Sequence, residues 1–463
     1  MGLHFLGETK MYGEGKIKSF LRLALSASRA DQLEAVIMTE DSRLTRFANS
    51  YIHQNVSESN VLLSIRAVIG KKIGIASTNI LTPEAIKQTV LQAWQIAAIQ
   101  KENPDFVSLP DPVKASAGTW NLLVPRTEKY TARERALAVK VICDRANKFG
   151  AKAYGAFSTG VAELGIANSL GIMQYNCSSD ANLNTVVMTE TGSGYGQGAA
   201  RDVGKINIKQ IAESAVKKAV ESQHPVELKP GIYPVVMEDM AAITLLEFLN
   251  YTGFSAMAVQ EGRSFMGLNM GKKIVSPKVT IVDDPHNTRG FAFPFDFEGV
   301  PKQKVTLIEK GVARNVVYDS FTANKAKQKN TGHALPAPAY YPMAGNLEMK
   351  GGDSSLEKMI ASTEKGVYIT RFHYCNLIDP MQVSITGMTR DGTFLIENGK
   401  ITKPVKNLRF TESVLKALSN VSAVSRKTTL VTEGGGYGHR FAVGTLVPAL
   451  KIDKFNFTGK TDF

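Results

Sequence analysis

An internal repeat in the first half of the chain constrains its fold more than any other feature. Asn49 is followed by strand-like residues, a glycine-bearing turn and a helical pattern that starts at Leu81. Asn168, 119 residues further on, is followed by the same succession, with a helical pattern that starts at Ile206. Such self-similarity indicates a duplicated supersecondary unit that cannot bury its apolar face alone.

A helical pattern also precedes each copy, over Ser19–Arg29 and Ala132–Phe149. We therefore expect each unit to run helix, hairpin strands, helix, and we expect the two units to pair so that both sheet faces are buried. Proline clusters at Pro104–Pro112 and Pro225–Pro230 indicate boundaries. The predicted domains are an amino-terminal α+β unit over 16–110, a second, repeat-related α+β unit over 113–224 and a β-rich carboxy-terminal domain over 231–463.

The second half reads mainly as short strands joined by turns. Ser354 and Glu357 have capping-box spacing before a short helix, which Gly366 is expected to stop. The pairs Asp391-Gly392 and Asn398-Gly399 each lie between apolar residues, which is a strong hairpin signal. Many strands at hairpin spacing predict a large curved or barrel-like sheet. The fold class is therefore α+β, with a duplicated α/β amino-terminal region followed by a large β-rich carboxy-terminal domain.

Composition excludes several classes of protein. A hydrophobic content of 43% and a charged content of 21% are ordinary for a globular protein, and no run approaches the roughly 18 apolar residues of a membrane span. The three cysteines lie far apart, and the start lacks the pattern of a secretory signal, so we expect a cytoplasmic protein without a disulfide scaffold. The net charge of +13 comes from scattered lysines rather than a DNA-binding motif, so we do not expect a nucleic-acid partner.

Several segments of the second half resemble the carboxy-terminal domain of the TldD/PmbA family. They are Glu261-Gly262-Arg263-Ser264-Phe265, Ile281–Pro285, Phe295–Pro301 and Gly345–Glu412, in the same order as in the family. The resemblance extends from about Ala30 to Ile452. It implies a relation to metallopeptidases.

The resemblance also shows where the zinc-binding residues of the family would stand. In zinc-bearing members, a helix at this place carries His-Glu-x-x-x-His, whereas this chain has Glu247, Phe248 and Thr252 at the motif positions. The family's metal-binding cysteine near the carboxy terminus aligns with Gly434. Zinc needs imidazole or thiolate ligands. The chain therefore looks like the PmbA subunit, also called TldE, and we expect no metal, no other cofactor and no catalytic residue of its own.

Other candidate residues keep more than one interpretation. His373 and Cys375 are two apart on a predicted strand, so both side chains would point to one face; they would start a metal site or belong to the core. The glycines of Gly192–Gly198 and Gly434–Gly438 would form tight turns or let a peptide backbone approach a sheet edge. The proposed peptide-binding residues are Gly434, Gly435, Gly436, Tyr437 and Arg263, although an intramolecular salt bridge would equally occupy Arg263.

The family resemblance implies a non-metal partner subunit in a heterodimer with a TldD-type zinc-bearing subunit. The pair would degrade or process unfolded or extended peptides, and this chain would contribute cleft wall and peptide binding. One alternative is an autonomous peptidase with a nonstandard site. Another is a non-enzymatic client-binding protein resembling a DNA gyrase modulator. Whether the isolated chain forms a homodimer stays open, and no membrane partner is expected.

Overall fold

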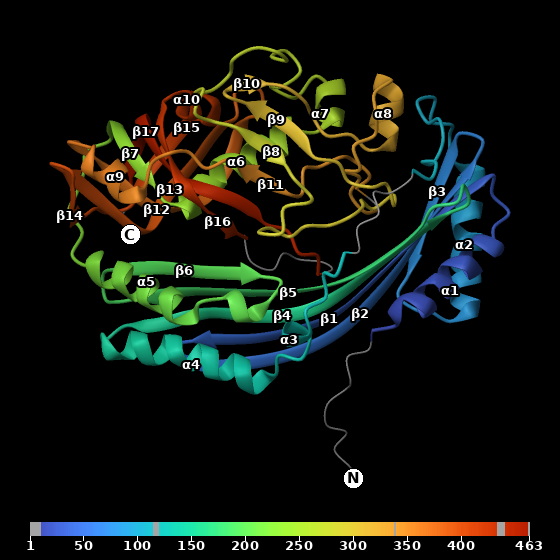
Figure 1. Cartoon of the computed structure of the whole chain (residues 1–463), viewed down its shortest axis with the longest axis horizontal. Coiled ribbons are helices and arrows are strands. Elements are labelled where there is room, and N and C mark those ends of the chain that lie inside the picture. The colour runs from blue at the N-terminus through green and yellow to red at the C-terminus, as the bar shows by residue number, and fades with distance from the viewer. Residues whose placement is uncertain (1–10, 114–119, 338, 433–439, 462–463) are drawn as a thin grey trace, which may run out of the picture.

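The structure is a computed structural model that describes residues 11–113, 120–337, 339–432 and 440–461. Two β-sheets lie one above the other, with the amino-terminal sheet below and the carboxy-terminal strands above (Figure 1). Helices cover the outer face of the lower sheet. The molecule is thus an α+β protein, as the sequence predicts.

Among the described residues, the lower sheet has six strands in the order β3-β2-β1-β4-β5-β6. Their bounds are β1 Gln32–Ala48, β2 Tyr51–Ile69, β3 Lys72–Thr78, β4 Lys152–Asn168, β5 Met173–Met188 and β6 Ser193–Ala200. Every neighbouring pair is antiparallel, including β1 and β4 at the centre, where Glu34 lies opposite Asn168 and Phe47 opposite Gly155. The strand order is symmetric about this central pair.

Each half of the sheet has the same succession of elements. The first half is α1 (Gly13–Ser26), β1, β2, β3 and α2 (Pro83–Ile99); the second is α4 (Ala132–Lys148), β4, β5, β6 and α5 (Ile208–Glu221). The repeat in the sequence therefore corresponds to a repeated topology. The expectation that the units pair so as to bury both faces is wrong, because they join edge to edge through β1 and β4.

The helices begin where local residues satisfy their first free N–H groups. Thr82 caps α2 by accepting from Ala85 N at 3.2 Å, with Pro83 in the first turn. Thr131 and Glu134 form a reciprocal capping box at the start of α4. All four helices of the repeat pack on the outer face of the sheet, as the core residues Leu33 and Phe47 near the two ends of β1 show.

Alternating residues of the same strands face the upper domain. Val36 and Met38 of β1 pack against Phe293, Phe295 and Phe297 of a carboxy-terminal loop. This follows from the two-residue period of a strand, which sends neighbouring side chains to opposite faces. The inner face of the lower sheet is therefore an interdomain surface.

In the part of the chain that the structure describes, the upper sheet has eleven strands, and part of it closes on itself. Strands β7, β12, β13, β15 and β17 form a ring, since β7 pairs with both β12 and β17. The ring surrounds core aromatics that include Phe372, Phe410 and Phe455. The strand bounds are β7 Gly231–Met237, β8 Ile281–Asp283, β9 Val305–Glu309, β10 Val312–Ala313, β11 Leu347–Met349, β12 Lys365–Asp379, β13 Ser384–Glu397, β14 Lys400–Pro404, β15 Leu408–Ser413, β16 Val421–Val431 and β17 Thr445–Lys460.

The segment around the zinc-motif positions forms two helices. Its apolar residues form α6 (Asp239–Gly253) and α7 (Ala256–Gln260), and between them Phe254 O accepts from Val317 N and Ala256 N donates to Val317 O. That backbone pairing interrupts the helix. The remaining helices are α3 Pro125–Glu128, the 3-10 helix Val203–Lys205, α8 Ser320–Ala326, α9 Leu356–Ala361 and α10 Val414–Ser419.

Three local predictions in the second half need correction. Helix α9 is capped by Ser355, not Ser354, and Gly366 lies within β12 rather than at the end of the helix. Asp391 and Gly392 do not form a hairpin turn, because β13 continues through them as a bulge opposite β12, with φ values of 56° and 123°. The Asn398-Gly399 turn between β13 and β14 is confirmed, with φ values of 50° and 73°.

The glycines of Gly192–Gly198 have a different role from either one predicted. They lie in and beside β6 rather than in a tight turn, and they face α5. A Cβ on Gly194 would lie 2.1 Å from Ala215 O of that helix. The absence of side chains lets the helix contact the strand directly. Among the described residues no helix is long and apolar enough to cross a membrane.

Candidate functional site

The two domains meet at Arg440, the first described residue after the glycine-rich segment. Its Nε and Nη2 atoms donate to the two carboxylate oxygens of Asp180 on β5, each at 2.7 Å. Its Nη1 donates to Ser42 Oγ on β1 at 3.0 Å, and its backbone N–H donates to the Glu40 carboxylate. A bidentate Arg–carboxylate pair fixes orientation as well as position. Arg440 thus holds the end of this segment on the inner face of the lower sheet.

The residue before the segment is held on the same sheet. The Asn182 side chain on β5 donates to Thr432 Oγ1. The Gln197 amide on β6, in the orientation that satisfies both of its groups, exchanges two hydrogen bonds with the Thr432 backbone, at 2.7 and 3.3 Å. Gly434, Gly435, Gly436 and Tyr437 lie outside the described residues. Both flanks of the predicted peptide-binding segment therefore contact the sheet that also carries Asp180.

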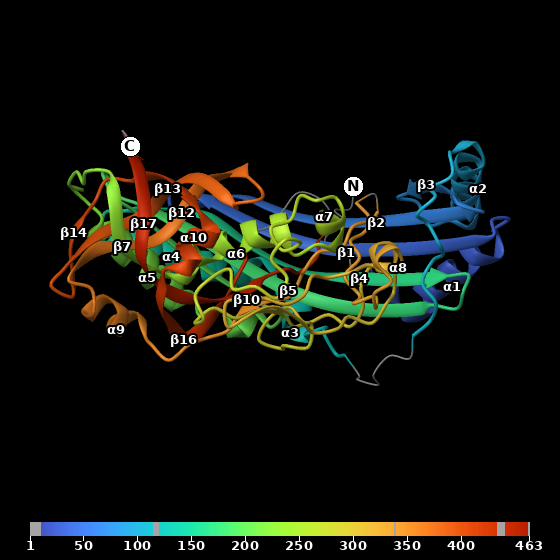
Figure 2. The ribbon, with the colours of Figure 1, turned by 90° about the horizontal axis from the view of Figure 1, so that it is seen from above.

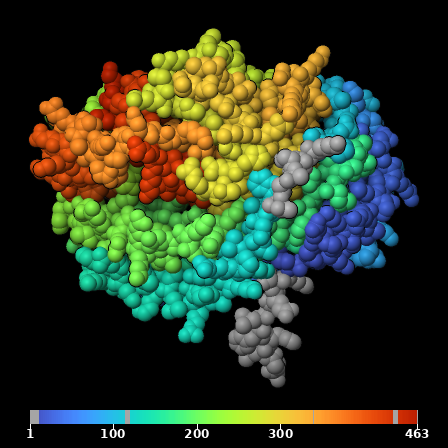
Figure 3. Space-filling view, viewed as in Figure 1, coloured from blue at the N-terminus to red at the C-terminus, as the bar shows by residue number. Residues whose placement is uncertain are grey.

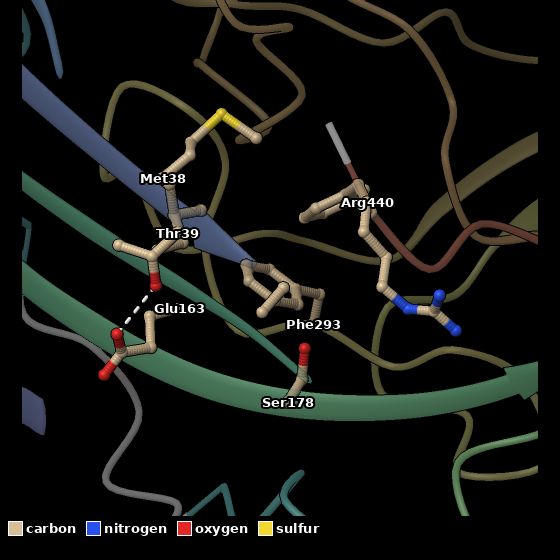
Figure 4. Close-up of a pocket in the computed structure, with 9 residues that line it drawn as sticks. Met38, Thr39, Glu163, Ser178, Phe293 and Arg440 are labelled. Atoms are coloured by element: carbon tan, nitrogen blue, oxygen red, sulfur yellow. Dashed lines mark hydrogen bonds between the residues drawn. The ribbon is translucent and has the colours of Figure 1, made fainter. Parts of the chain in front are cut away.

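A small cavity lies beside Arg440 at this junction (Figure 4). Met38 and Thr39 of β1, Glu163 of β4, Ser178 of β5, and Phe293 and Arg440 of the upper domain line it (Figure 4). Its volume is about 10 Å³, which is the space of one water molecule. In the space-filling view, the green second repeat meets the red and orange carboxy-terminal strands along a hollow (Figure 3). The cavity itself is too small for a peptide side chain.

The residues that the family resemblance aligns with the zinc motif, Glu247, Phe248 and Thr252, lie on α6 and include no histidine or cysteine. Phe248 packs against the core of the upper domain. Thr252 is buried, and its hydroxyl donates to Phe248 O of the same helix at 2.7 Å. Glu247 is half-buried on the same helix. The phenyl ring of Phe248 offers no metal ligand, and the Thr252 hydroxyl already donates to its own helix. These residues therefore do not fit a zinc ion.

The prediction that His373 and Cys375 share a face is wrong. Tyr374, between them, has φ of 48°, and the register of β12 on β13 shifts between His373 and Asn376. This bulge turns Cys375 toward Gly387 and the core, while His373 lies opposite Met388, which is outside that core cluster. Because a bulge adds one residue to a strand, the two-residue rule fails across it. Within the described ranges, no three His, Cys, Asp or Glu side chains are grouped to hold a metal ion.

Arg263 is engaged by a neighbour. Its Nε donates to Glu261 Oε2 at 2.5 Å, and half of each side chain is exposed. The intramolecular salt bridge, one of the two interpretations of this residue, is present. The structure places Arg263 just after α7, far along the chain from the Arg440 junction.

A buried charge cluster was not anticipated as a unit by the sequence analysis. Arg66 of β2 donates through Nη2 to Glu34 Oε2 of β1 at 2.7 Å and to Glu298 Oε1 of the upper domain at 3.0 Å. Burial raises the pKa of Glu34 to about 7, although the Arg66 charge opposes this. Glu298 also accepts from the backbone and hydroxyl of Ser320. The cluster links the two domains through almost fully buried side chains.

Two more carboxyl groups of the upper domain, those of Asp296 and Asp283, are buried. Burial, with the nearby Glu298 charge, raises the pKa of Asp296 to about 8, and its oxygens accept three backbone N–H groups. Asp283 Oδ1 bonds His333 Nε2 at 2.9 Å. Burial lowers the pKa of His333, while the charge of Asp283 opposes this. The sequence showed these residues next to prolines and glycines, but nothing local signalled that Asp283 and His333 would meet across 50 residues.

Comparisons with known proteins agree with this architecture. A family profile described as "PmbA/TldA metallopeptidase C-terminal domain" matches residues 230–459, and another, "PmbA/TldA metallopeptidase domain 1", matches residues 33–97. The chain is 26% identical over 430 residues to a metalloprotease TldD homolog of Haemophilus influenzae, covering 86% of each chain. It is 24% identical over 420 residues to metalloprotease PmbA of Escherichia coli O157:H7, covering 87% of this chain and 89% of the relative.

Two solved structures share the fold. TldE from Thermococcus kodakarensis superposes with a TM-score of 0.84 at 21% identity, over 96% of this chain and all of that one. A candidate modulator of a DNA gyrase from Thermotoga maritima also gives 0.84, at 19% identity, over 95% of this chain. The two stacked sheets and the matched profiles define a metallopeptidase-related α+β protein. More specifically, the chain belongs to the TldD/PmbA family.

Proposed function

We propose that this chain is the non-metal partner subunit of a TldD-type zinc metallopeptidase that acts on unfolded or extended peptides. The observation that carries the proposal is the residue set on α6. Glu247, Phe248 and Thr252 stand where a zinc-bearing relative has His-Glu-x-x-x-His, and the Thr252 hydroxyl is bonded to its own helix. The chemistry must then come from another subunit.

The chain's own contribution would be to form a cleft wall. Arg440 and Thr432 attach both flanks of the glycine-rich segment to the inner face of the lower sheet. Glycines there would let an extended peptide pair with the backbone, which recognises peptides largely without regard to side chains. The three free thiols are compatible with a reducing compartment, and we place the protein in the cytoplasm.

The test is reconstitution. The purified chain should hold no stoichiometric zinc and cleave no unfolded peptide alone, but it should co-purify with a His-Glu-x-x-x-His subunit and increase cleavage by it. About one zinc per chain, or peptidase activity of the chain alone, would support an autonomous peptidase instead.

The description of one structural neighbour favours a second candidate function. One neighbour is described as a candidate modulator of a DNA gyrase, which points to client binding without cleavage. Stable binding of an intact protein client by this chain, with no gain in cleavage when a zinc-bearing subunit is added, would favour that function.

A further inference from the structure

A second hollow lies between the carboxyl end of α1 and one face of α2. Both helices lie at the end of the molecule opposite the ring that contains β7 and β17 (Figure 2). The volume of the hollow is about 300 Å³, which is at the lower limit for a small-molecule site. Its lining residues are Ala27, Arg29, Lys87, Val90, Leu91 and Trp94. The hollow shares no residue with the junction at Arg440.

Two packed helices form the wall of this hollow. The four lining residues of α2 follow one another at intervals of three, one and three, so they share one face of the helix. Ala27 and Arg29 come directly after α1, which ends at Ser26. Val90 packs in the same core cluster as Phe20 of α1, so the two helices are fixed relative to one another.

The second repeat contains a corresponding helix pair, and two glycines define the correspondence. A Cβ on Gly74 of β3 would lie 2.1 Å from Ala93 O of α2. A Cβ on Gly194 of β6 would likewise lie 2.1 Å from Ala215 O of α5. The two alanines therefore occupy equivalent places, and so do the residues that follow them.

Those following residues, Trp94 and Val216, differ in burial. Val216 is 2% exposed and belongs to one core cluster with Ala146 in the last turn of α4. Helix α4 has 17 residues, whereas α1 has 14. Trp94 is only half-buried, although its side chain is much larger than that of valine. The hollow therefore arises from a difference between the two repeats.

Two positive charges lie at the hollow. Arg29 and Lys87 are both exposed, and within the described ranges neither makes a hydrogen bond or an ion pair. The Asp31 carboxylate, two residues after Arg29, accepts from Gly70 N at 2.7 Å instead. Glu84, one turn before Lys87, makes no ion pair with it. The hollow thus combines an apolar surface with two cations that have no carboxylate partner.

We propose that this hollow binds a small aromatic carboxylate. The aromatic ring would pack against Leu91 and Trp94, because indole rings favour edge and offset contacts with other rings. The carboxylate would accept charge-assisted hydrogen bonds from Arg29 and Lys87. A free aromatic amino acid would bring its ammonium group close to the same two cations, so we expect an acid without an amino group. This inference does not depend on the proposed function.

The probe is 4-phenylbutanoate, a ring and a carboxylate joined by a short chain. The chain has two tryptophans, so Trp120→Phe leaves Trp94 as the only fluorescent indole. Titration of this variant should change its fluorescence with a dissociation constant of about 0.1–1 mM, as expected for a ligand of this size. The neutral 4-phenylbutanamide has nearly the same shape and should bind at least about 4-fold more weakly. No change in fluorescence, or equal binding of the two compounds, would overturn the proposal.

Charge variants show whether the two cations act locally. Arg29→Gln and Lys87→Gln should each weaken carboxylate binding about 2- to 5-fold and leave amide binding unchanged. Lys209→Gln is the matched control, because Lys209 precedes Ala215 by six residues, as Lys87 precedes Ala93. Each variant lowers the net charge from +13 to +12. Equal weakening by Lys87→Gln and Lys209→Gln would show only a general attraction of anions to a basic chain, and would overturn the site.

A filling variant tests the location. Ala27→Phe places a ring in the hollow and should abolish measurable binding of 4-phenylbutanoate. Ala98→Phe adds the same ring at an exposed position of α2 and should bind as the unmodified chain does. Thermal unfolding of both variants shows that they are folded. Undiminished binding by folded Ala27→Phe, or equal loss in both variants, would contradict a site at this hollow.

Discussion

The Arg66 guanidinium lies between two carboxylates that come from different domains, 2.7 Å from Glu34 and 3.0 Å from Glu298. The three side chains are almost fully buried. Removing one member of such a group leaves an uncompensated buried charge, which costs more than the group as a whole contributes. The joint between the lower sheet and the upper domain is therefore sensitive to single substitutions here.

The first prediction concerns this joint. Arg66→Met should lower the free energy of unfolding by about 3–5 kcal/mol, because Glu34 and Glu298 lose their shared cation. Urea unfolding at neutral pH measures the change. Lys140→Met is the control, since Lys140 and Asp144 form an exposed pair whose loss should cost no more than about 0.5 kcal/mol. Similar losses in both variants would contradict the role of burial.

A second prediction concerns pH. The pKa of Glu34 is raised by burial to about 7 from 4.5, so the folded chain keeps a proton that the unfolded chain releases. The stability this carboxyl contributes is therefore complete below about pH 4.5 and is lost as the pH rises through about 7. Glu34→Gln should make the decline in unfolding free energy between pH 5 and 7 shallower, by at most about 1.4 kcal/mol per pH unit. An unchanged slope in Glu34→Gln would contradict the contribution of this buried carboxyl group.

A third prediction concerns the glycines beneath α5. Gly194→Ala should destabilise the chain by about 1–3 kcal/mol, because the methyl group would lie 2.1 Å from Ala215 O and force strand and helix apart. Gly15→Ala in α1 is the matched change in open space, and it should stabilise by about 0.5–1 kcal/mol. Thermal unfolding of both variants compares them. Unchanged stability of the Gly194→Ala variant would show that α5 does not contact β6 directly.

A fourth prediction tests the glycine-rich segment. Gly435→Val should leave folding and association with a zinc-bearing subunit intact but strongly reduce cleavage of an unfolded peptide, because a β-branched side chain would block close backbone approach. Stability must be measured in parallel, since glycine can also serve a turn. Undiminished cleavage by a folded, associated variant would leave the segment with no peptide-binding role.

Local sequence patterns predicted a large part of the fold. The repeat around Asn49 and Asn168 indicated two units of one topology, and the helical pattern over Ala132–Phe149 predicted α4. The Asn398-Gly399 turn was also predictable. These features depend on residues a few positions apart, whose backbone preferences act independently of the tertiary contacts.

Tertiary structure decided how these pieces meet. The sequence did not show that the two units join through β1 and β4, because edge pairing leaves no local signal in either strand. It misplaced Cys375 and Asp391, because a bulge depends on the partner strand. The same reason applies to the site. The residue types on α6 could be read directly, whereas the contacts of Arg440 with Asp180 and of Arg66 with Glu298 join segments more than 200 residues apart and arise only from packing.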